Sequence, residues 1–309
     1  MKRRNFLKAS AASVALSTLP NLVKANSNSS AEVELSFALL TDVHLEPTVV
    51  AVNGFTRALK AINNQKIKPS FIINGGDSIF DSLERPEKDI AAQWEVWHKI
   101  NAEQNKLPMF HCIGNHDVYG WMNPDPAIKN SPDYGKARVL RELKMSHSYY
   151  KFKMKSWNFI VLDSVHKHPK GYEARLDEEQ FKWLATQLQD IPRQEPIVII
   201  SHMPLFSAVY NYVFEGKTSE LFTDLTNRIL VHRDGWEIKE LIKNYPNVKL
   251  CLSGHLHLQE EINYLQTSYV NCGAVCGNWW KGKLQEFEPA FFNFHLLKDG
   301  SFKYEVVNY

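Results

Sequence analysis

The chain has 309 residues, with 44% hydrophobic and 23% charged residues, which is the composition of an ordinary globular protein of one large or two small domains. These values exclude disordered, collagen-like and coiled-coil chains. The formal net charge is +2, but the first 25 residues hold five cations and no acid, so the rest of the chain carries 31 basic and 34 acidic residues. The rest of the chain has no excess of basic residues of the kind that general nucleic-acid binding needs, so we expect no nucleic-acid partner.

Residues 1–25 have the organisation of a signal peptide. A basic start, Met1 to Lys8, precedes the mildly apolar stretch Ala9 to Leu22, and Val23-Lys24-Ala25 offers small residues for cleavage. The apolar stretch is shorter than the ~20 residues that span a bilayer, so no stable membrane span is expected. An amphipathic N-terminal helix of the folded domain is the less favoured alternative.

The segment Arg3 to Lys8 reads Arg-Arg-Asn-Phe-Leu-Lys, which resembles the twin-arginine export signal. The resemblance implies that the precursor uses the twin-arginine export machinery and that the mature protein is periplasmic or secreted. Residues 26–32 form a polar linker, and we expect a single domain over residues 33–309.

Short apolar and β-branched runs alternate with helix-length segments along the chain, which predicts an α/β architecture. The expected strands are Leu35–Leu40, Phe71–Ile73, Met109–Ile113, Asn158–Leu162, Ile197–Ile200 and Lys249–Leu252. The expected helices are Val49–Asn64, Glu87–Gln104, Leu176–Leu188 and Trp236–Asn244. A terminal hairpin, Phe291–Leu297 and Phe302–Val307 around a Lys-Asp-Gly turn, indicates that the sheets are mixed.

Four cysteines remain after the signal segment. Cys112 and Cys251 lie in apolar runs, where a buried free thiol is favoured. Cys272 and Cys276 have a C-x₃-C spacing that matches neither the usual zinc pair nor a redox pair. Two small core residues are the preferred interpretation, and a Cys272–Cys276 disulfide is the alternative.

Polar clusters follow five of the apolar runs, at the strand ends where open α/β sheets place their sites. They are Asp42-Val43-His44, Gly75-Gly76-Asp77, Gly114-Asn115-His116-Asp117, Ser201-His202-Met203-Pro204 and Gly254-His255-Leu256-His257. A lone Gly-Gly-Asp is a weak signal and a lone His-x-His a moderate one, but Gly-Asn-His-Asp is specific. Five such clusters at five strand ends favour a functional site over chance.

The residue types in these clusters suit metal ions. Carboxylate and amide oxygens mixed with imidazoles favour borderline ions such as Mn, Fe or Zn. The candidate ligands are Asp42, His44, Asp77, Asn115, His202, His255 and His257. Seven ligands are too many for one tetrahedral ion with an open position, whereas two ions that share a carboxylate fit.

In this order, the five motifs resemble those of the calcineurin-like metallophosphoesterase superfamily, over about residues 35 to 273. The resemblance implies two mixed sheets packed as a sandwich and flanked by helices, with two metal ions at the strand ends. It assigns Asp42, His44 and His257 to one metal, Asn115, His202 and His255 to the other, and Asp77 to a bridging position. It also implies that His116 protonates the leaving oxygen or steadies the phosphate, oriented by Asp117.

Departures from better-known subgroups narrow the resemblance. Protein Ser/Thr phosphatases carry arginines beside the corresponding aspartate and asparagine, but the segments Gly76 to Asp81 and Ile113 to Asp117 have none. Purple acid phosphatases place a tyrosine ligand where this chain has Phe80. The group around the class III cyclic-nucleotide phosphodiesterases is the most similar. We therefore expect a small phosphate ester as substrate, with phosphodiesters ahead of phosphomonoesters; a phosphomonoesterase or protein phosphatase, or a non-catalytic metal-bearing module, are the alternatives.

Aromatic residues cluster beside several motifs, as in Tyr119-Gly120-Trp121, Tyr210-Asn211-Tyr212 and Asn278-Trp279-Trp280. Packing of loop bases is the favoured role for these rings, and stacking on a substrate ring is the alternative. Lys281 and Lys283 either occupy a solvated turn or bind a distal anion.

Overall fold

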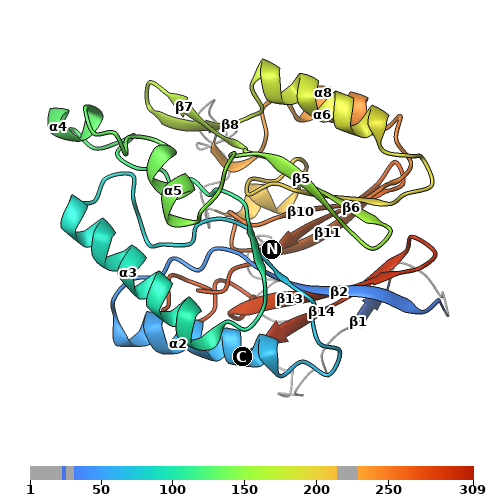
Figure 1. Ribbon diagram of the computed structural model, residues 1–309, viewed down its shortest axis with the longest axis horizontal. Helices are drawn as coiled ribbons and strands as arrows, with labels where there is room; N and C mark the ends of the chain where they lie inside the picture. The colour runs from blue at the N-terminus through green and yellow to red at the C-terminus, as the bar shows by residue number, and fades with distance from the viewer. Residues whose placement is uncertain (1–22, 26–30, 214–228) are drawn as a thin grey trace, which may run out of the picture.

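The computed structural model describes residues 23–25, 31–213 and 229–309 (Figure 1). The predicted signal peptide lies outside these residues except for Val23–Ala25, which forms the edge strand β1. The predicted linker over 26–32 is described only from residue 31 onward. Cleavage after Ala25 therefore stays a prediction. Within the described ranges, no helix is both long and apolar enough to cross a membrane.

Two mixed sheets pack face to face, as the sequence predicts. The first has the order β1-β14-β13-β2-β3-β4, and the second has the order β11-β12-β10-β9-β6-β5. The strands of the first sheet are β1 (Val23–Ala25), β2 (Val33–Leu40), β3 (Ile72–Asn74), β4 (Met109–His111), β13 (Ala290–Leu297) and β14 (Phe302–Asn308). Those of the second are β5 (Tyr150–Met154), β6 (Trp157–Val161), β9 (Ile197–Ile200), β10 (Val248–Ser253), β11 (Gln259–Tyr264) and β12 (Thr267–Cys272).

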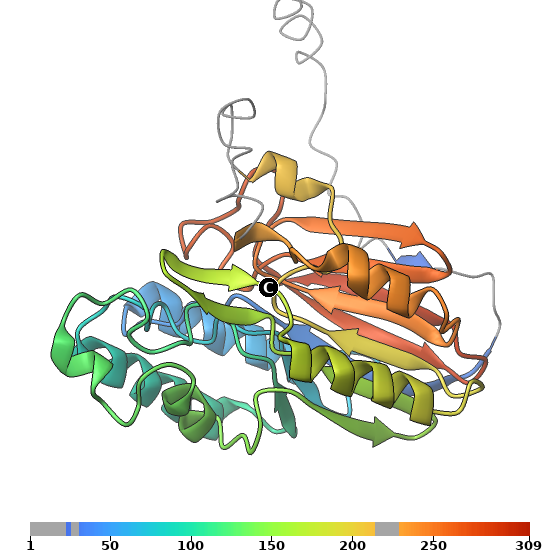
Figure 2. The same ribbon diagram turned by 90° about the horizontal axis from the view of Figure 1, so that it is seen from above.

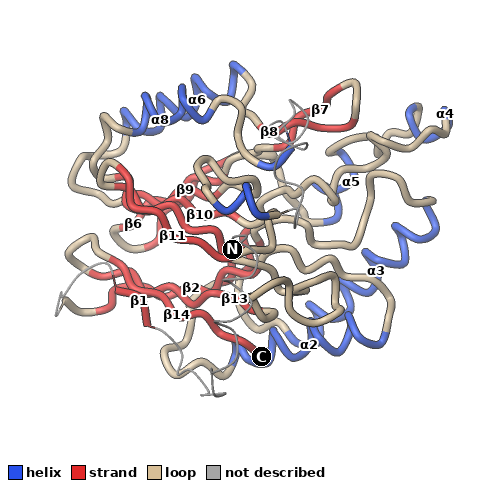
Figure 3. Tube along the Cα trace, turned by 180° about the vertical axis from the view of Figure 1, so that it is seen from behind, coloured by secondary structure: helices blue, strands red, loops and turns tan. Residues whose placement is uncertain are grey.

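Helices cover the outer face of each sheet, so the molecule has four layers (Figures 1 and 3). The helices α2 (Val49–Asn63) and α3 (Glu87–Gln104) lie against the first sheet, and α6 (Glu178–Asp190) and α8 (Gly235–Ile242) lie against the second. The smaller elements are α4 (Pro126–Lys129), α5 (Ala137–Glu142), the 3₁₀ turn η1 (Val209–Tyr212) and the hairpin β7 (Val165–His168) with β8 (Gly171–Ala174). Figure 2 shows this arrangement from above.

Local sequence explains where the main helices begin. Thr48 caps α2, because its hydroxyl accepts a hydrogen bond from the backbone N–H of Ala51, and Asp177 caps α6 by accepting from Gln180 N at 2.7 Å. The cap at Asp177 explains why this helix starts two residues after the predicted Leu176. One face of α2 is buried at helical spacing, through Ala51, Gly54, Phe55, Ala58, Leu59 and Ile62.

The core between the sheets is built from phenylalanines. Phe37 of β2 stacks on Phe71 and Phe294 at centroid distances of 5.3 and 5.1 Å, and meets Phe159 of β6 edge-on at 5.6 Å. All four rings are fully buried. Because Phe159 belongs to the second sheet, this cluster joins the two layers and fixes which strand ends meet.

The topology brings the five motifs to one edge. The strands β2, β3 and β4 run parallel in the first sheet, and β6, β9, β10 and β12 run parallel in the second. The carboxyl ends of parallel strands share an edge of their sheet. Each predicted cluster follows one of these strands, so the candidate ligands come from both layers.

Candidate metal centre

Five of the predicted ligands have a left-handed backbone, which is uncommon for any residue other than glycine. The φ angles of Asp42, His44, Asp77, His255 and His257 are +54°, +44°, +51°, +69° and +58°. Such conformations cost roughly 1–3 kcal/mol each and persist only where the surroundings enforce them. Backbone strain is therefore concentrated at the ends of β2, β3 and β10, where these side chains turn into the same space.

Two motif glycines allow the ligand loops to approach one another. A Cβ at Gly114 would overlap the backbone nitrogen and carboxylate of Asp77, and one at Gly254 would overlap the side chains of Thr41 and Asp42. Glycine is required here for close approach rather than for turn geometry. Close packing between the loops therefore explains why a glycine precedes Asn115 and His255.

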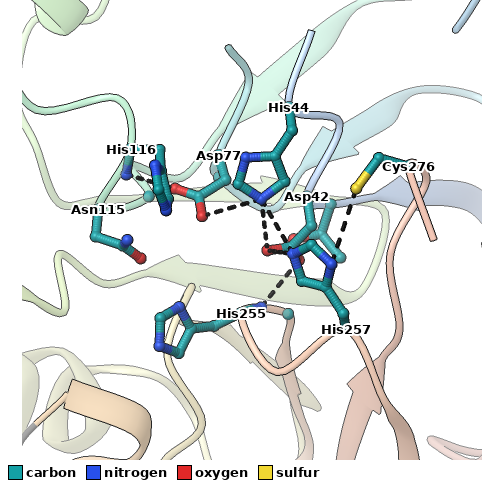
Figure 4. Close-up of polar contacts among 12 residues, drawn as sticks. Asp42, His44, Asp77, Asn115, His116, His255, His257 and Cys276 are labelled. Atoms are coloured by element: carbon teal, nitrogen blue, oxygen red, sulfur yellow. Dashed lines mark hydrogen bonds and ion pairs between the residues drawn. The ribbon is translucent and has the colours of Figure 1, made fainter. Parts of the chain in front are cut away.

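Asp42, His44 and His257 converge on one point (Figure 4). Their facing atoms are close: His44 Nε2 lies 3.0 Å from His257 Nε2, and Asp42 Oδ1 lies 3.4 Å from His257 Nε2. All three residues are buried. The other ring nitrogen of His257 donates to the carbonyl oxygen of Gly277 at 2.8 Å, so in the neutral ring Nδ1 carries the proton and Nε2 the lone pair.

This arrangement fits a cation. His44 Nδ1 faces the carbonyl oxygen of Phe80 at 3.4 Å, which assigns the lone pair of His44 to Nε2 as well. Burial opposes the charged form of His257, but Cys276 and Asp42 raise its pKa well above the usual value, so a proton lies on this ring when no metal is bound. Once that proton is lost, two lone pairs point at each other beside Asp42 Oδ1, a buried oxygen without a hydrogen-bond partner among the described residues. Such a group of acceptors is unfavourable unless a cation lies between them.

Asp77, Asn115, His202 and His255 form a second group of the same kind. His202 Nε2 lies 3.2 Å from both Asp77 Oδ2 and Asn115 Oδ1, while its Nδ1 donates to the carbonyl oxygen of Gly75 at 2.9 Å. His255 donates from Nε2 to the Ile229 carbonyl oxygen at 2.7 Å, which leaves Nδ1 as its ligand atom. The ligand atoms of Asp77, His202 and His255 all lie within 4.8 Å of one another.

Asp77 lies between the two groups. Its Oδ2 is 3.5 Å from His44 Nε2 in the first group and 3.2 Å from His202 Nε2 in the second. Burial acts to raise the pKa of Asp77, but His202, His116 and His44 lower that pKa well below its usual range. At Asp42, burial also acts to raise the pKa, but the neighbouring imidazoles outweigh it and lower this pKa to about 2. Both carboxyl groups are therefore anionic.

The ionisation of the imidazoles also suits a metal site. Burial lowers the pKa of His255 to about 4 and that of His44 well below its usual value. Burial opposes the charged form of His202 too, but Asp77 raises its pKa to about 9. A cation bound between His202 and Asp77 would replace that proton.

His116 lies beside these groups, and its ring is held by a residue that the sequence did not indicate. His116 Nδ1 is 3.2 Å from Asp81 Oδ1, and the backbone N–H of His116 donates to Asp77 Oδ1 at 2.8 Å. Asp81 is itself fixed, because its carboxylate accepts from the backbone N–H groups of Leu83 and Glu84. In the sequence, Asp81 follows the apolar pair Ile79-Phe80 four residues after Asp77, so no pattern marks it.

The predicted contact between Asp117 and the His116 ring is wrong. Asp117 accepts hydrogen bonds from the backbone N–H of Ser78 at 2.8 Å and of Gly114 at 2.9 Å. Its carboxylate therefore points away from the imidazole and ties the Asp77 loop to the Asn115 loop. The carboxylate of Asp117 thus accepts hydrogen bonds from buried backbone N–H groups of two loops instead of contacting the imidazole.

All four cysteines are buried free thiols, so the Cys272–Cys276 disulfide is not formed. Cys276 has a position that the sequence did not indicate: its Sγ lies 3.8 Å from His257 Nδ1 (Figure 4). His44, His257 and Cys276 form one of the residue groups able to hold a metal. The shorter bond of His257 Nδ1 to Gly277 O makes the thiol a neighbour of the ring rather than its main partner.

A cleft of about 970 Å³ opens beside the two groups. Its walls combine site residues with aromatic and charged side chains from several loops. The lining residues include Phe80, Asp81, Arg85, His116, Lys170, Trp279 and Lys281. The cleft is within the size range of small-molecule sites.

Comparison with known proteins identifies the family of the chain and several similar proteins. Residues 35–259 match the calcineurin-like phosphoesterase family. The chain is 24% identical to the 3′,5′-cyclic adenosine monophosphate phosphodiesterase CpdA of Haemophilus influenzae, over 86% of this chain and 87% of that one. It is also 24% identical to the manganese-dependent ADP-ribose/CDP-alcohol diphosphatase of Arabidopsis thaliana, over 63% and 67%. A dimetal phosphatase from Danio rerio shares the fold, with a TM-score of 0.61 and 12% identity over 86% of this chain and 94% of that one.

Proposed function

The chain belongs to the calcineurin-like phosphoesterase family, which makes it a hydrolase, and on that premise we propose that it cleaves phosphodiesters ahead of phosphomonoesters at a centre of two metal ions. In this proposal Asp42, His44 and His257 hold one ion. Asn115, His202 and His255 hold the other, and Asp77 bridges the two.

The observation that carries the proposal is the position of Asp77. One oxygen of its carboxylate is 3.5 Å from an imidazole of the first group and 3.2 Å from one of the second, so a single side chain reaches both. The mixture of carboxylate, amide and imidazole donors favours Mn, Fe or Zn. When bound, two such ions polarise the phosphoryl oxygens and lower the pKa of the attacking water.

In this proposal, His116 supplies the proton that the leaving oxygen needs. Burial opposes its charged form, but the carboxylates of Asp77 and Asp81 raise the pKa of His116 above its ordinary value. Asp81 engages Nδ1, which leaves Nε2 to donate at the edge of the cleft. A positioned acid of this kind contributes about 10²–10⁴-fold to rate.

The preference for diesters rests on two supports. The motif segments Gly76 to Asp81 and Ile113 to Asp117, which follow β3 and β4, carry no arginine beside the proposed ligands to grip the extra charge of a monoester. Relatives that this chain matches over more than 85% of its length are named as cyclic-nucleotide phosphodiesterases.

A substrate panel tests the proposal. Bis(4-nitrophenyl) phosphate, 4-nitrophenyl phosphate and cyclic AMP would each be assayed with Mn, Zn and Fe, with Asp77→Ala as the background control. We expect metal-dependent hydrolysis with the highest kcat/KM for diesters and no activity in excess chelator. Faster monoester cleavage would favour the phosphomonoesterase alternative, and no turnover with any metal would indicate a non-catalytic module.

We also propose export of the precursor by the twin-arginine machinery, to a periplasmic or secreted location. The support is the sequence around Arg3 and Arg4, which lie outside the described residues. Replacing both with Lys should retain the precursor in the cytoplasm, whereas Lys2→Arg should not. Unchanged export of the double variant would point to another route.

A further inference from the structure

The cleft beside the metal centre is far larger than one phosphate group needs. Its volume is about 970 Å³, and its walls carry aromatic and cationic side chains that take no part in the proposed phosphate chemistry. These side chains face whatever the substrate carries beyond the scissile phosphate. Their arrangement therefore bears on the class of substrate.

Two consecutive tryptophans, of which Trp279 lines the cleft, have strained backbones. Trp279 and Trp280 have φ angles of +51° and +64°, a conformation rarely adopted by bulky residues. Trp280 is anchored at two points: its backbone N–H donates to Cys276 O at 2.8 Å, and its indole N–H donates to His44 O at 3.0 Å. Strain that the surroundings maintain in this way is typical of functional positions.

The helix α2 makes room for this anchor. Gly54 lies in the middle of α2, and a Cβ at that position would overlap the indole ring of Trp280. Glycine is a poor helix former, so its presence inside α2 has a packing reason. Because Trp280 is held against Gly54, the backbone of the preceding residue, Trp279, is held in place as well.

Trp279 thereby lies over the ligand imidazoles. Its ring centroid is 3.9 Å from that of His44 and 5.4 Å from that of His257, with interplanar angles of 37° and 30°. Phe80 meets it edge-on at 5.3 Å. Since Trp279 and Phe80 both line the cleft, they form an aromatic wall directly beside the position expected for the scissile phosphate.

Three cations border the same cleft. The guanidinium of Arg85 lies over the ring of Phe80 at 5.0 Å, and Lys170 and Lys281 line the cleft as well. In the part of the chain that the structure describes, none of the three forms an ion pair with a carboxylate. The acids that also line the cleft are Glu46, Asp81 and Glu84, and Asp81 is engaged by His116.

We propose that Trp279 is the specificity-determining residue of this cleft: it stacks on a planar ring of the substrate while Arg85, Lys170 and Lys281 hold an anionic group beyond the scissile phosphate. The substrate class is a phosphodiester that carries both a planar ring and a second anionic group, such as a nucleotide with an additional phosphate. This inference rests on the proposed phosphodiesterase function.

Three substrates separate the two parts of the inference. Glycerophosphoethanolamine has neither ring nor second phosphate, the dinucleotide ApA has rings, and pApA adds one terminal phosphate to ApA. In the wild-type protein we expect kcat/KM to rise in that order. Trp279→Ala should raise KM for both dinucleotides by about tenfold or more, with little change for the ringless diester, and Trp279→Phe should restore part of the loss.

The cationic group has its own test. The double variant Lys170→Ala with Lys281→Ala should remove the advantage of pApA over ApA, about tenfold, and leave ApA unchanged. Lys283→Ala is the matched control, because Lys283 is close in sequence but does not line the cleft. An unchanged pApA to ApA ratio in the double variant would refute the anion site.

A purely structural role of Trp279 gives a different result. If the indole only shields His44, Trp279→Ala should lose bound metal and slow all three substrates equally, which would overturn the stacking role. Gly54→Ala, at a residue that does not line the cleft, should displace Trp280 and reproduce the rise in KM for the dinucleotides. If the wild-type protein with metal cleaves none of the three, the phosphodiesterase function fails; if it cleaves them without discrimination, only this inference fails.

Discussion

Between the two sheets, the rings of Phe37, Phe71, Phe159 and Phe294 stack in relaxed strands and exclude water. At the strand ends, Asp42, His44, Asp77 and His257 are also buried, but on left-handed backbones. The first region follows the rules that make a fold stable, and the second breaks several of them. Burial of charge and backbone strain both cost free energy of folding, so packing in the core must offset the destabilisation that the site causes.

This difference predicts that substitutions in the two regions act on different quantities. Changes in the core should lower the free energy of unfolding and spare the chemistry of the folded fraction. Changes at the strand ends should lower the rate and leave stability nearly intact. The following variants test that separation, from the largest expected effect to the smallest.

His116→Ala should slow hydrolysis of esters with poor leaving groups by about 10²–10⁴-fold, because these need a proton on the departing oxygen. Esters of nitrophenol should lose much less, and both metals should remain bound. The measurement is kcat/KM over a series of leaving groups together with metal content, with the exposed His98→Ala as control. Equal losses on good and poor leaving groups would leave His116 as a phosphate-binding residue.

Phe37→Ala should lower the free energy of unfolding by about 3–5 kcal/mol, since it removes a fully buried ring that contacts both sheets. Urea unfolding in the presence of chelator would measure this loss without a contribution from bound metal. Phe206→Ala is the control, because Phe206 is 44% exposed and its loss should change stability only slightly. A large fall in kcat for folded Phe37→Ala would contradict the separation of core and site.

Asp81→Asn should reduce kcat about tenfold through His116 rather than through the metals. The Asp81 carboxylate raises the pKa of His116, so its removal should lower that pKa. Because the proposed acid role of His116 requires its protonated form, the alkaline limb of the pH–rate profile should move to lower pH. A reduced rate with an unmoved limb would show that Asp81 only supports the loop.

Asp133→Asn should have the smallest effect, below about 1 kcal/mol, because the partner Arg141 is half exposed and solvent screens the pair. The hydrogen bond from Arg141, with help from Arg138, lowers the pKa of Asp133 in the folded state. Its stabilisation is therefore present above the unfolded pKa of about 3.9 and is lost as the pH falls through the lower folded value. Urea unfolding at pH 7 and at about pH 3 should show the difference between variant and wild type shrinking at the lower pH.

The sequence predicted the strands and helices whose pattern is strong. Ile197–Ile200 and Glu87–Gln104 form with the predicted bounds, because a continuous β-branched run and a long amphipathic segment specify their own structure. Gln259–Tyr264 was not predicted, because its polar residues carry no strand pattern and it pairs at a sheet edge. The terminal hairpin is confirmed with an added residue at each outer end.

At the site, the structure brings together all seven predicted ligands, because each of them follows shortly after a strand and these strand ends meet at one edge. Asp81, Cys276 and the orientation of Asp117 were not predictable. These side chains take their positions from contacts between loops that are far apart in sequence, as between Cys276 and His257. Only tertiary packing decides such contacts.

The central claim is that one carboxylate joins two metal ions, and the metal content of Asp77→Ala tests it most directly. Wild-type protein loaded with Mn or Zn and freed of excess ion should hold two ions per chain, as measured by mass spectrometry of the metals. Asp77→Ala should hold clearly fewer and lose turnover of bis(4-nitrophenyl) phosphate, while it remains folded. A variant that keeps two ions and a near-normal rate would contradict the bridging role of Asp77 and with it the two-metal centre.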